Sequence, residues 1–101
     1  MFLSQSDKEI LNNLKGRISK LLSKNRKISV EDRTTSEKIY KTIDKLILLN
    51  KQSNGHNYTH LRNILCSYKG ELNLSKNEYI QKHILPLLSR VLNTRETEKD
   101  E

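Results

Sequence analysis

Residues 72–93 read LNLSKNEYIQKHILPLLSRVLN, and this stretch decides the fold. Its apolar residues recur every three or four positions, which is the spacing of one helix face. Ser75 and Glu78 have the pattern of a capping box, so we predict that a helix begins near Ser75. Leu74 is expected to pack on Tyr79 as a hydrophobic staple. The apolar face of this predicted helix consists of Ile80, Ile84, Leu87, Leu88, Val91 and Leu92.

Pro86 lies inside this predicted helix, where proline removes a backbone hydrogen bond and crowds the carbonyl of Lys82. In an exposed helix interior this costs about 3 kcal/mol. The apolar face continues in phase on both sides of Pro86, and its burial, at roughly 25 cal/mol per Å², can offset that cost. The pattern therefore predicts one helix kinked at Pro86. A helix that ends near His83, followed by a separate last turn, is the alternative.

Two segments nearer the N-terminus have the same helical spacing. The first begins at a capping box of Ser6 and Glu9, and the second at another of Thr34 and Glu37. We interpret residues 25–34 between them as a connection. The apolar faces are Ile10, Leu11, Leu14, Ile18, Leu21 and Leu22 in the first segment, and Ile39, Tyr40, Ile43, Leu46, Ile47 and Leu49 in the second.

A third segment follows the polar residues QSNGHN (52–57), in which Asn54 and Gly55 tolerate positive φ. Gly70 stands where the residue after a helix end is expected, so we predict that this helix stops there. The apolar residues of the segment are Tyr58, Leu61, Ile64, Leu65 and Tyr68.

Composition agrees with helices, because three Gly and one Pro in 101 residues are too few for the corners of a β-sandwich. Four amphipathic helices with short connections predict an all-α fold, an antiparallel up-down four-helix bundle over residues 1–94 with its last helix kinked at Pro86. Residues 95–101, RETEKDE, contain no apolar group, and we expect a disordered charged tail there.

The formal net charge of +7 is unevenly distributed, because residues 1–94 hold 17 basic and 8 acidic residues, a net charge of +9. Such a body is attracted to polyanions or to an anionic membrane surface. A solvated lysine-rich surface explains the charge equally well. The run SKLLSKNRK (19–27) places cations at the end of the first predicted helix, where they either complement the helix dipole or form an anion-binding patch.

Three features predict a cytoplasmic location with at most peripheral membrane contact. Cys66 is the single cysteine, which suits a reducing compartment, and we interpret it as a small packing residue. Asp7 and Glu9 follow the start closely, with no apolar signal segment after them. The longest apolar run, LILL (46–49), is far shorter than the ~20 residues of a spanning helix.

No residue pattern indicates catalysis or a bound cofactor. The glycines at positions 16, 55 and 70 are too scattered for a phosphate-binding loop. His56 and His60 have the spacing of a helical metal-ligand pair, but no third ligand has motif spacing. We therefore predict no enzyme activity, no catalytic residue, no metal and no cofactor.

A small basic helical nucleic-acid-binding or phage-type regulatory protein is the alternative class. The segment HNYTHLRN (56–63) could be the recognition helix of a helix-turn-helix motif. The expected connection before it, about six residues long, is longer than that motif's tight turn. Self-association as a scaffold is a third hypothesis, and the oligomeric state is left open.

From about residue 35 onward, the chain resembles the pediocin-like (class IIa) bacteriocin immunity proteins of the enterocin A immunity type. The residues that carry the resemblance are SEKIYKTIDKLILLNKQSNG (36–55), HLRNILCSYKGE (60–71) and LNLSKNEYIQKHILPLLSRV (72–91). The resemblance implies a four-helix bundle in the cytoplasm of a Gram-positive bacterium. It also implies that the protein protects the producer cell from a pore-forming peptide.

The resemblance implies a partner as well, the complex of the bacteriocin with the mannose phosphotransferase permease, contacted at the inner face of the membrane. In that family the C-terminal half, here from about His56 to Glu101, determines which bacteriocin is countered. We expect stoichiometric binding through the outer faces of the third and fourth helices, without a small-molecule substrate. Cations would guide the approach to the anionic inner leaflet. The candidate partner-binding residues are Lys69, Lys76, Lys82, Arg90 and Arg95.

Overall fold

The described part of the chain consists of helices and their connections, without a strand. This computed structural model describes residues 5–24, 27–52 and 55–100; the side chains of residues 49–52, 55–58 and 93–100 are not described. The elements are α1 (Gln5–Lys24), α2 (Val30–Gln52), α3 (Gly55–Leu72), the π-helical segment η1 (Ile80–Ile84) and α4 (Leu85–Asp100). For these residues the predicted all-α fold is confirmed.

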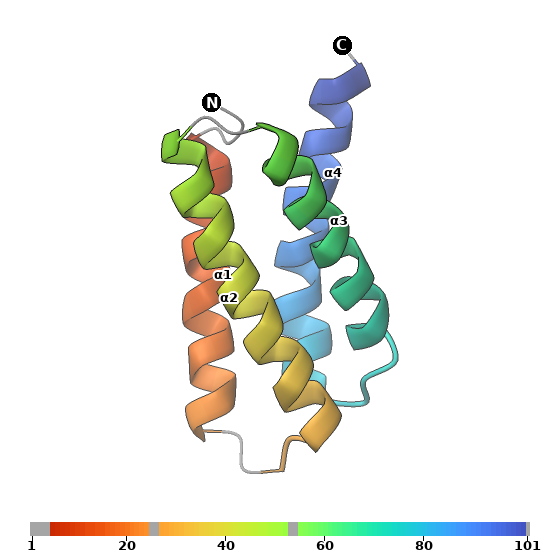
Figure 1. Cartoon of the computed structure of the whole chain (residues 1–101). Coiled ribbons are helices and arrows are strands. Elements are labelled where there is room, and N and C mark those ends of the chain that lie inside the picture. The colour runs from red at the N-terminus through yellow and green to blue at the C-terminus, as the bar shows by residue number, and fades with distance from the viewer. Residues whose placement is uncertain (1–4, 25–26, 53–54, 101) are drawn as a thin grey trace.

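The four helices lie side by side around one core (Figure 1). α1 contacts α2 and α4, and α3 contacts the same two helices, so each helix has two principal neighbours. The longest dimension of the molecule is 40 Å, slightly more than the ~35 Å length of a helix the size of α2. The bundle is therefore about one helix long.

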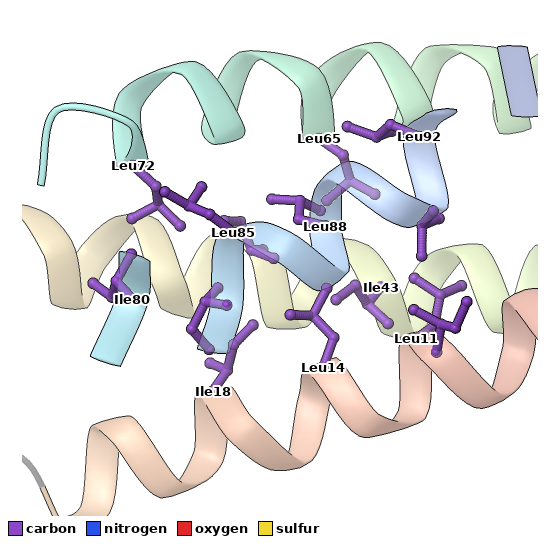
Figure 2. Packing of buried hydrophobic residues seen from close by; sticks show 14 of the residues in the cluster. Leu11, Leu14, Ile18, Ile43, Leu65, Leu72, Ile80, Leu85, Leu88 and Leu92 are labelled. Atoms are coloured by element: carbon purple, nitrogen blue, oxygen red, sulfur yellow. The ribbon is translucent and has the colours of Figure 1, made fainter. Parts of the chain in front are cut away.

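The core is built mainly from the apolar faces that the sequence predicted, with two buried additions, Leu72 and Leu85. Ile64 of the predicted third face is half-buried and lies outside this core. Figure 2 shows side chains from all four helices pointing toward one another. Leu72 is in phase with the predicted face of the third helix, four residues after Tyr68, and is buried because α3 continues past Gly70. Fully buried members include Leu11, Leu14, Ile18, Leu21, Ile39, Ile43, Leu65, Leu72, Ile80, Ile84 and Leu88.

The burial of Leu85 has a different cause, the π-helical turn of η1. The backbone N–H of Leu85 donates to the carbonyl of Ile80, five residues back. A turn of this kind holds one residue more than an α-turn, so Ile80 and Leu85 face the same core while Pro86 is exposed. Residues 78–100 form one continuous helical run, so the alternative in which a helix ends near His83 is wrong.

The predicted start of the second helix is wrong by five residues. α2 begins at Val30, and the Ser29 hydroxyl accepts the Asp32 backbone N–H at 3.1 Å. The Ser29 carbonyl accepts the Arg33 N–H at 2.9 Å. Ser29 is therefore the N-cap, and Thr34 lies inside the helix that it was predicted to cap. Ser29 and Asp32 have the spacing of a capping box with Asp in place of Glu.

The last helical run is also capped differently from the prediction. Asn77 Oδ1 accepts the Ile80 backbone N–H at 3.1 Å, so Asn77 is the capping residue. The Ser75 hydroxyl accepts the Asn77 N–H at 3.0 Å and itself donates to Asp32 Oδ2 at 2.7 Å. The predicted hydrophobic staple is wrong, because Leu74 is 84% exposed.

The start of α1 and the end of α3 also differ from the prediction. α1 begins at Gln5, ahead of the predicted cap Ser6, and Gly70 lies inside α3 instead of following it. The turn predicted at Asn54 lies outside the described residues. The domain boundary at residue 94 and the charged tail at 95–101 stay predictions; the backbone of residues 95–100 belongs to α4, and the side chains from residue 93 onward are not described.

Gly70→Ala is expected to stabilise the protein by about 1 kcal/mol, the difference between glycine and alanine in a helix interior. Gly70 is exposed, and a Cβ built there has no heavy atom within 4 Å. Urea denaturation measures the change as a higher midpoint at an unchanged slope. A lower midpoint would show that the helix does not continue through Gly70.

Candidate binding groove

A groove of about 770 Å³ lies where α2 begins and where the loop of residues 73–77 leads from α3 toward η1. Both segments are at the lower end of the bundle in Figure 1. The hydrogen bond from the Ser75 hydroxyl to Asp32 Oδ2 joins its two sides, although these residues are 43 positions apart. The Gln81 side-chain amide donates to the Ser75 carbonyl at 2.7 Å, which connects the loop to the last helical run. The loop is thereby attached to α2.

Two exposed apolar side chains line this groove, Val30 from α2 and Leu74 from the loop. They are 79% and 84% exposed. The other large apolar side chain that is exposed in the described part of the chain, Leu48, lies outside the groove and is 57% exposed. Apolar groups that gather at a hollow, rimmed by polar residues, are typical of a contact surface for another molecule.

The polar rim of the groove carries both signs of charge. A site for a polyanion such as nucleic acid is dominated by cations, whereas this rim is balanced. An apolar centre within a polar rim is the usual anatomy of a protein–protein contact, and charges of both signs in the rim can be matched by complementary charges on a partner. The charged residues are Lys27, Lys38 and Lys76 with Glu31, Asp32 and Glu71.

Of the five predicted partner-binding cations, Lys76 lines the groove. Lys82 and Arg90 are exposed, and Lys69 is half-buried, but none of these three lines it. The side chain of Arg95 lies outside the described residues. In the groove Lys76 is accompanied by Lys27, from the basic run 19–27, and by Lys38, which the sequence analysis did not select.

Val30 and Leu74 are the groove residues that sequence reasoning missed. Each had a signal in the sequence, because Val30 is an apolar residue within the predicted connection 25–34 and Leu74 is an apolar residue within a polar loop. Neither signal shows that the two residues share one groove, since they are far apart in the chain.

The described residues contain no group of three His, Cys, Asp or Glu side chains placed to hold a metal ion. His60 and His83 are exposed, and the His83 ring packs on the Tyr79 ring at a centroid distance of 4.9 Å. Cys66 is exposed, so the predicted packing role is wrong. None of the described helices is both long and apolar enough to cross a membrane.

The connection between α2 and α3 is shorter than the six residues expected, because α2 ends at Gln52 and α3 begins at Gly55. The two helices lie side by side (Figure 1), whereas helix-turn-helix motifs cross at about 90–120°. Comparisons with protein-family models, curated proteins and solved structures gave no match.

Proposed function

We propose that this chain is a cytoplasmic immunity protein that protects its producer cell from a pore-forming class IIa-type bacteriocin. It acts by stoichiometric binding at the inner face of the mannose phosphotransferase permease, without catalysis. The observation that supports a contact function best is the groove in which Val30 and Leu74 stand exposed within a charged rim. The resemblance over residues 36–55, 60–71 and 72–91 is the reason for choosing this partner.

The bundle that presents the groove is proposed to be antiparallel and up-down, with its last helix kinked at Pro86. The arrangement of neighbours supports this topology, because α4 contacts α1 and closes a ring of four helices. In Figure 1 the starts of α2 and of the last helical run lie at the lower end of the bundle, and the start of α3 lies at the upper end. Proline and π-turns are both common causes of helix kinks, and η1 directly precedes Leu85 and Pro86.

In this proposal the groove receives an apolar side chain of a cytosolic permease loop between Val30 and Leu74. Lys27, Lys38 and Lys76 pair with carboxylates that flank it. The exposed cations Lys82 and Arg90, together with Lys69 and Arg95, strengthen attraction to the anionic inner leaflet, which acts within roughly one Debye length of the surface, about 8 Å.

Expression in a bacteriocin-sensitive strain tests the function and the groove together. The wild-type chain is expected to allow growth against at least one member of a class IIa panel. The double variant Val30→Ser/Leu74→Ser is expected to lose protection, because both side chains would contact the partner. Leu48→Ser removes a similarly exposed apolar side chain outside the groove, so it is the matched control and should protect as wild type does.

Thermal melts by circular dichroism check that all variants are equally folded. Unchanged killing by every bacteriocin in cells that contain folded wild-type protein would contradict the immunity function. Protection that survives the double variant would place the contact surface elsewhere. A gel shift that is sequence-specific and weakens steeply with salt would favour the nucleic-acid-binding class instead.

A further inference from the structure

A second groove, of about 700 Å³, lies between α1 and the start of the last helical run. Residues 12–23 of α1 form one side, and Tyr79 and His83 form the other. Its chemistry differs from that of the first groove. Arg17 and Lys20 supply positive charge, and the remaining polar side chains are amides, hydroxyls and an imidazole, with no carboxylate among the lining residues. These polar residues are Asn12, Asn13, Ser19, Ser23, Tyr79 and His83.

The guanidinium of Arg17 is positioned at this groove by a contact across the helix interface. Its Nη1 donates to the backbone carbonyl of His83 at 3.0 Å, although the two residues are 66 positions apart. This bond uses one of the five N–H donors of an arginine side chain. His83 belongs to η1, and π-turns of this kind occur frequently at functional sites. The wide turn thus presents a carbonyl that orients Arg17.

Gly16 leaves room in this groove. It lines the groove, and a Cβ built on it has no heavy atom within 4 Å. A glycine in a helix interior costs about 1 kcal/mol relative to alanine, and no close contact in this structure requires it. The result is an open, carboxylate-free hollow next to a held arginine and Lys20.

We propose that this groove binds a phosphate group. Arginine and lysine together with hydroxyl and amide donors are the groups that recognise phosphate oxygens, and arginine does so with two parallel hydrogen bonds. The absence of a carboxylate from the lining avoids the repulsion that an acidic residue would exert. The phosphate comes either from an anionic lipid headgroup or from a free phosphate compound. The inference stands on this groove alone and does not depend on the immunity function.

Gly16→Glu and Gly16→Gln form the first test. Glu and Gln have nearly the same size and both favour helix over glycine, so the two variants differ in charge alone. The new carboxylate would repel phosphate and would pair with Lys20 one turn later. In NMR titrations with inorganic phosphate, shifts are expected at residues 12–23 and 79–83. Gly16→Glu should bind about tenfold more weakly than Gly16→Gln, because repulsion between two charges a few ångströms apart at a protein surface is of that order. Equal binding by the two variants would overturn the proposal.

Arg17→Gln and Lys45→Gln form the second test, because each removes one positive charge and Lys45 is exposed on α2 outside the groove. Sedimentation with phosphatidylcholine vesicles, with and without phosphatidylglycerol, identifies the source of the phosphate. Binding to the anionic vesicles that Arg17→Gln weakens and Lys45→Gln does not would identify a lipid headgroup. Phosphate shifts at the groove without such vesicle binding would identify a free phosphate compound. If Arg17→Gln and Lys45→Gln behave alike in both assays, the groove is not a phosphate site.

Discussion

Leu88→Ala is expected to lower the free energy of unfolding by about 3 kcal/mol, while Leu74→Ala is expected to change it by less than about 0.5 kcal/mol. The chemical change is the same at both positions. Leu88 is fully buried between the helices (Figure 2), and truncating it leaves a cavity as well as lost contacts. Leu74 is exposed, so its truncation removes little packing.

Urea denaturation of the wild type and the two variants measures both effects. A domain of this size has a total stability of about 5–15 kcal/mol, so the loss at Leu88 would be a large share of it. Equal midpoints for the two variants would show that Leu88 is not in the core. A large loss of stability in Leu74→Ala would mean that the loop of residues 73–77 supports the fold. The groove variants would then report on folding instead of binding.

Deleting Lys82 is expected to be tolerated when Pro86 is also replaced by alanine, whereas deleting Lys41 from α2 should cost more than about 4 kcal/mol. Deletion within η1 converts its five-residue turn into an α-turn, so Ile80 and Leu85 still face the core. Deletion in the middle of α2 rotates the two halves of that helix by about 100° relative to each other. Ile39 and Leu46, which now lie on one face seven residues apart, could then not both point into the core.

The Pro86 substitution isolates the role of the π-turn. With Lys82 deleted, Pro86 would lie in a regular α-helix, where proline costs about 3 kcal/mol. Pro86→Ala should therefore stabilise the deletion variant by about that amount and the full-length chain by clearly less, since η1 already accommodates the proline. Denaturation of the four proteins forms a double-mutant cycle. An equal effect of Pro86→Ala in both backgrounds would show that the π-turn does not relieve the proline.

The two grooves differ in their charge and in their exposed apolar side chains. The groove that Val30 and Leu74 line has balanced charges and exposed apolar side chains, which suits a protein segment. The groove that Arg17 lines has cations and neutral donors, which suits a phosphate group. Because the substitutions Val30→Ser/Leu74→Ser and Gly16→Glu affect different grooves, loss of protection and loss of phosphate binding can be measured separately.

The start of α2 could not be predicted from local sequence patterns alone. The chain contains two competing capping patterns at the start of α2, Ser29 with Asp32 and Thr34 with Glu37. Both are chemically reasonable, because each could satisfy backbone N–H groups. The structure uses the earlier one, and this puts Thr35 and Ser36 into the buried face of α2. The packing of α2 against its neighbours therefore decides where this helix begins. A capping pattern of four or five residues does not contain that information.

The sequence by itself determined the helical class and the faces that meet in the core, as Leu14, Ile43 and Leu88 illustrate. These features depend on side-chain spacing within a few turns, and that spacing is visible in the order of residues. Only the tertiary structure decided that Ser75 meets Asp32, that Arg17 reaches His83, and that a π-turn brings Leu85 into the core. Such contacts join distant segments or shift the helical phase, and their geometry is set by the packing of the whole core.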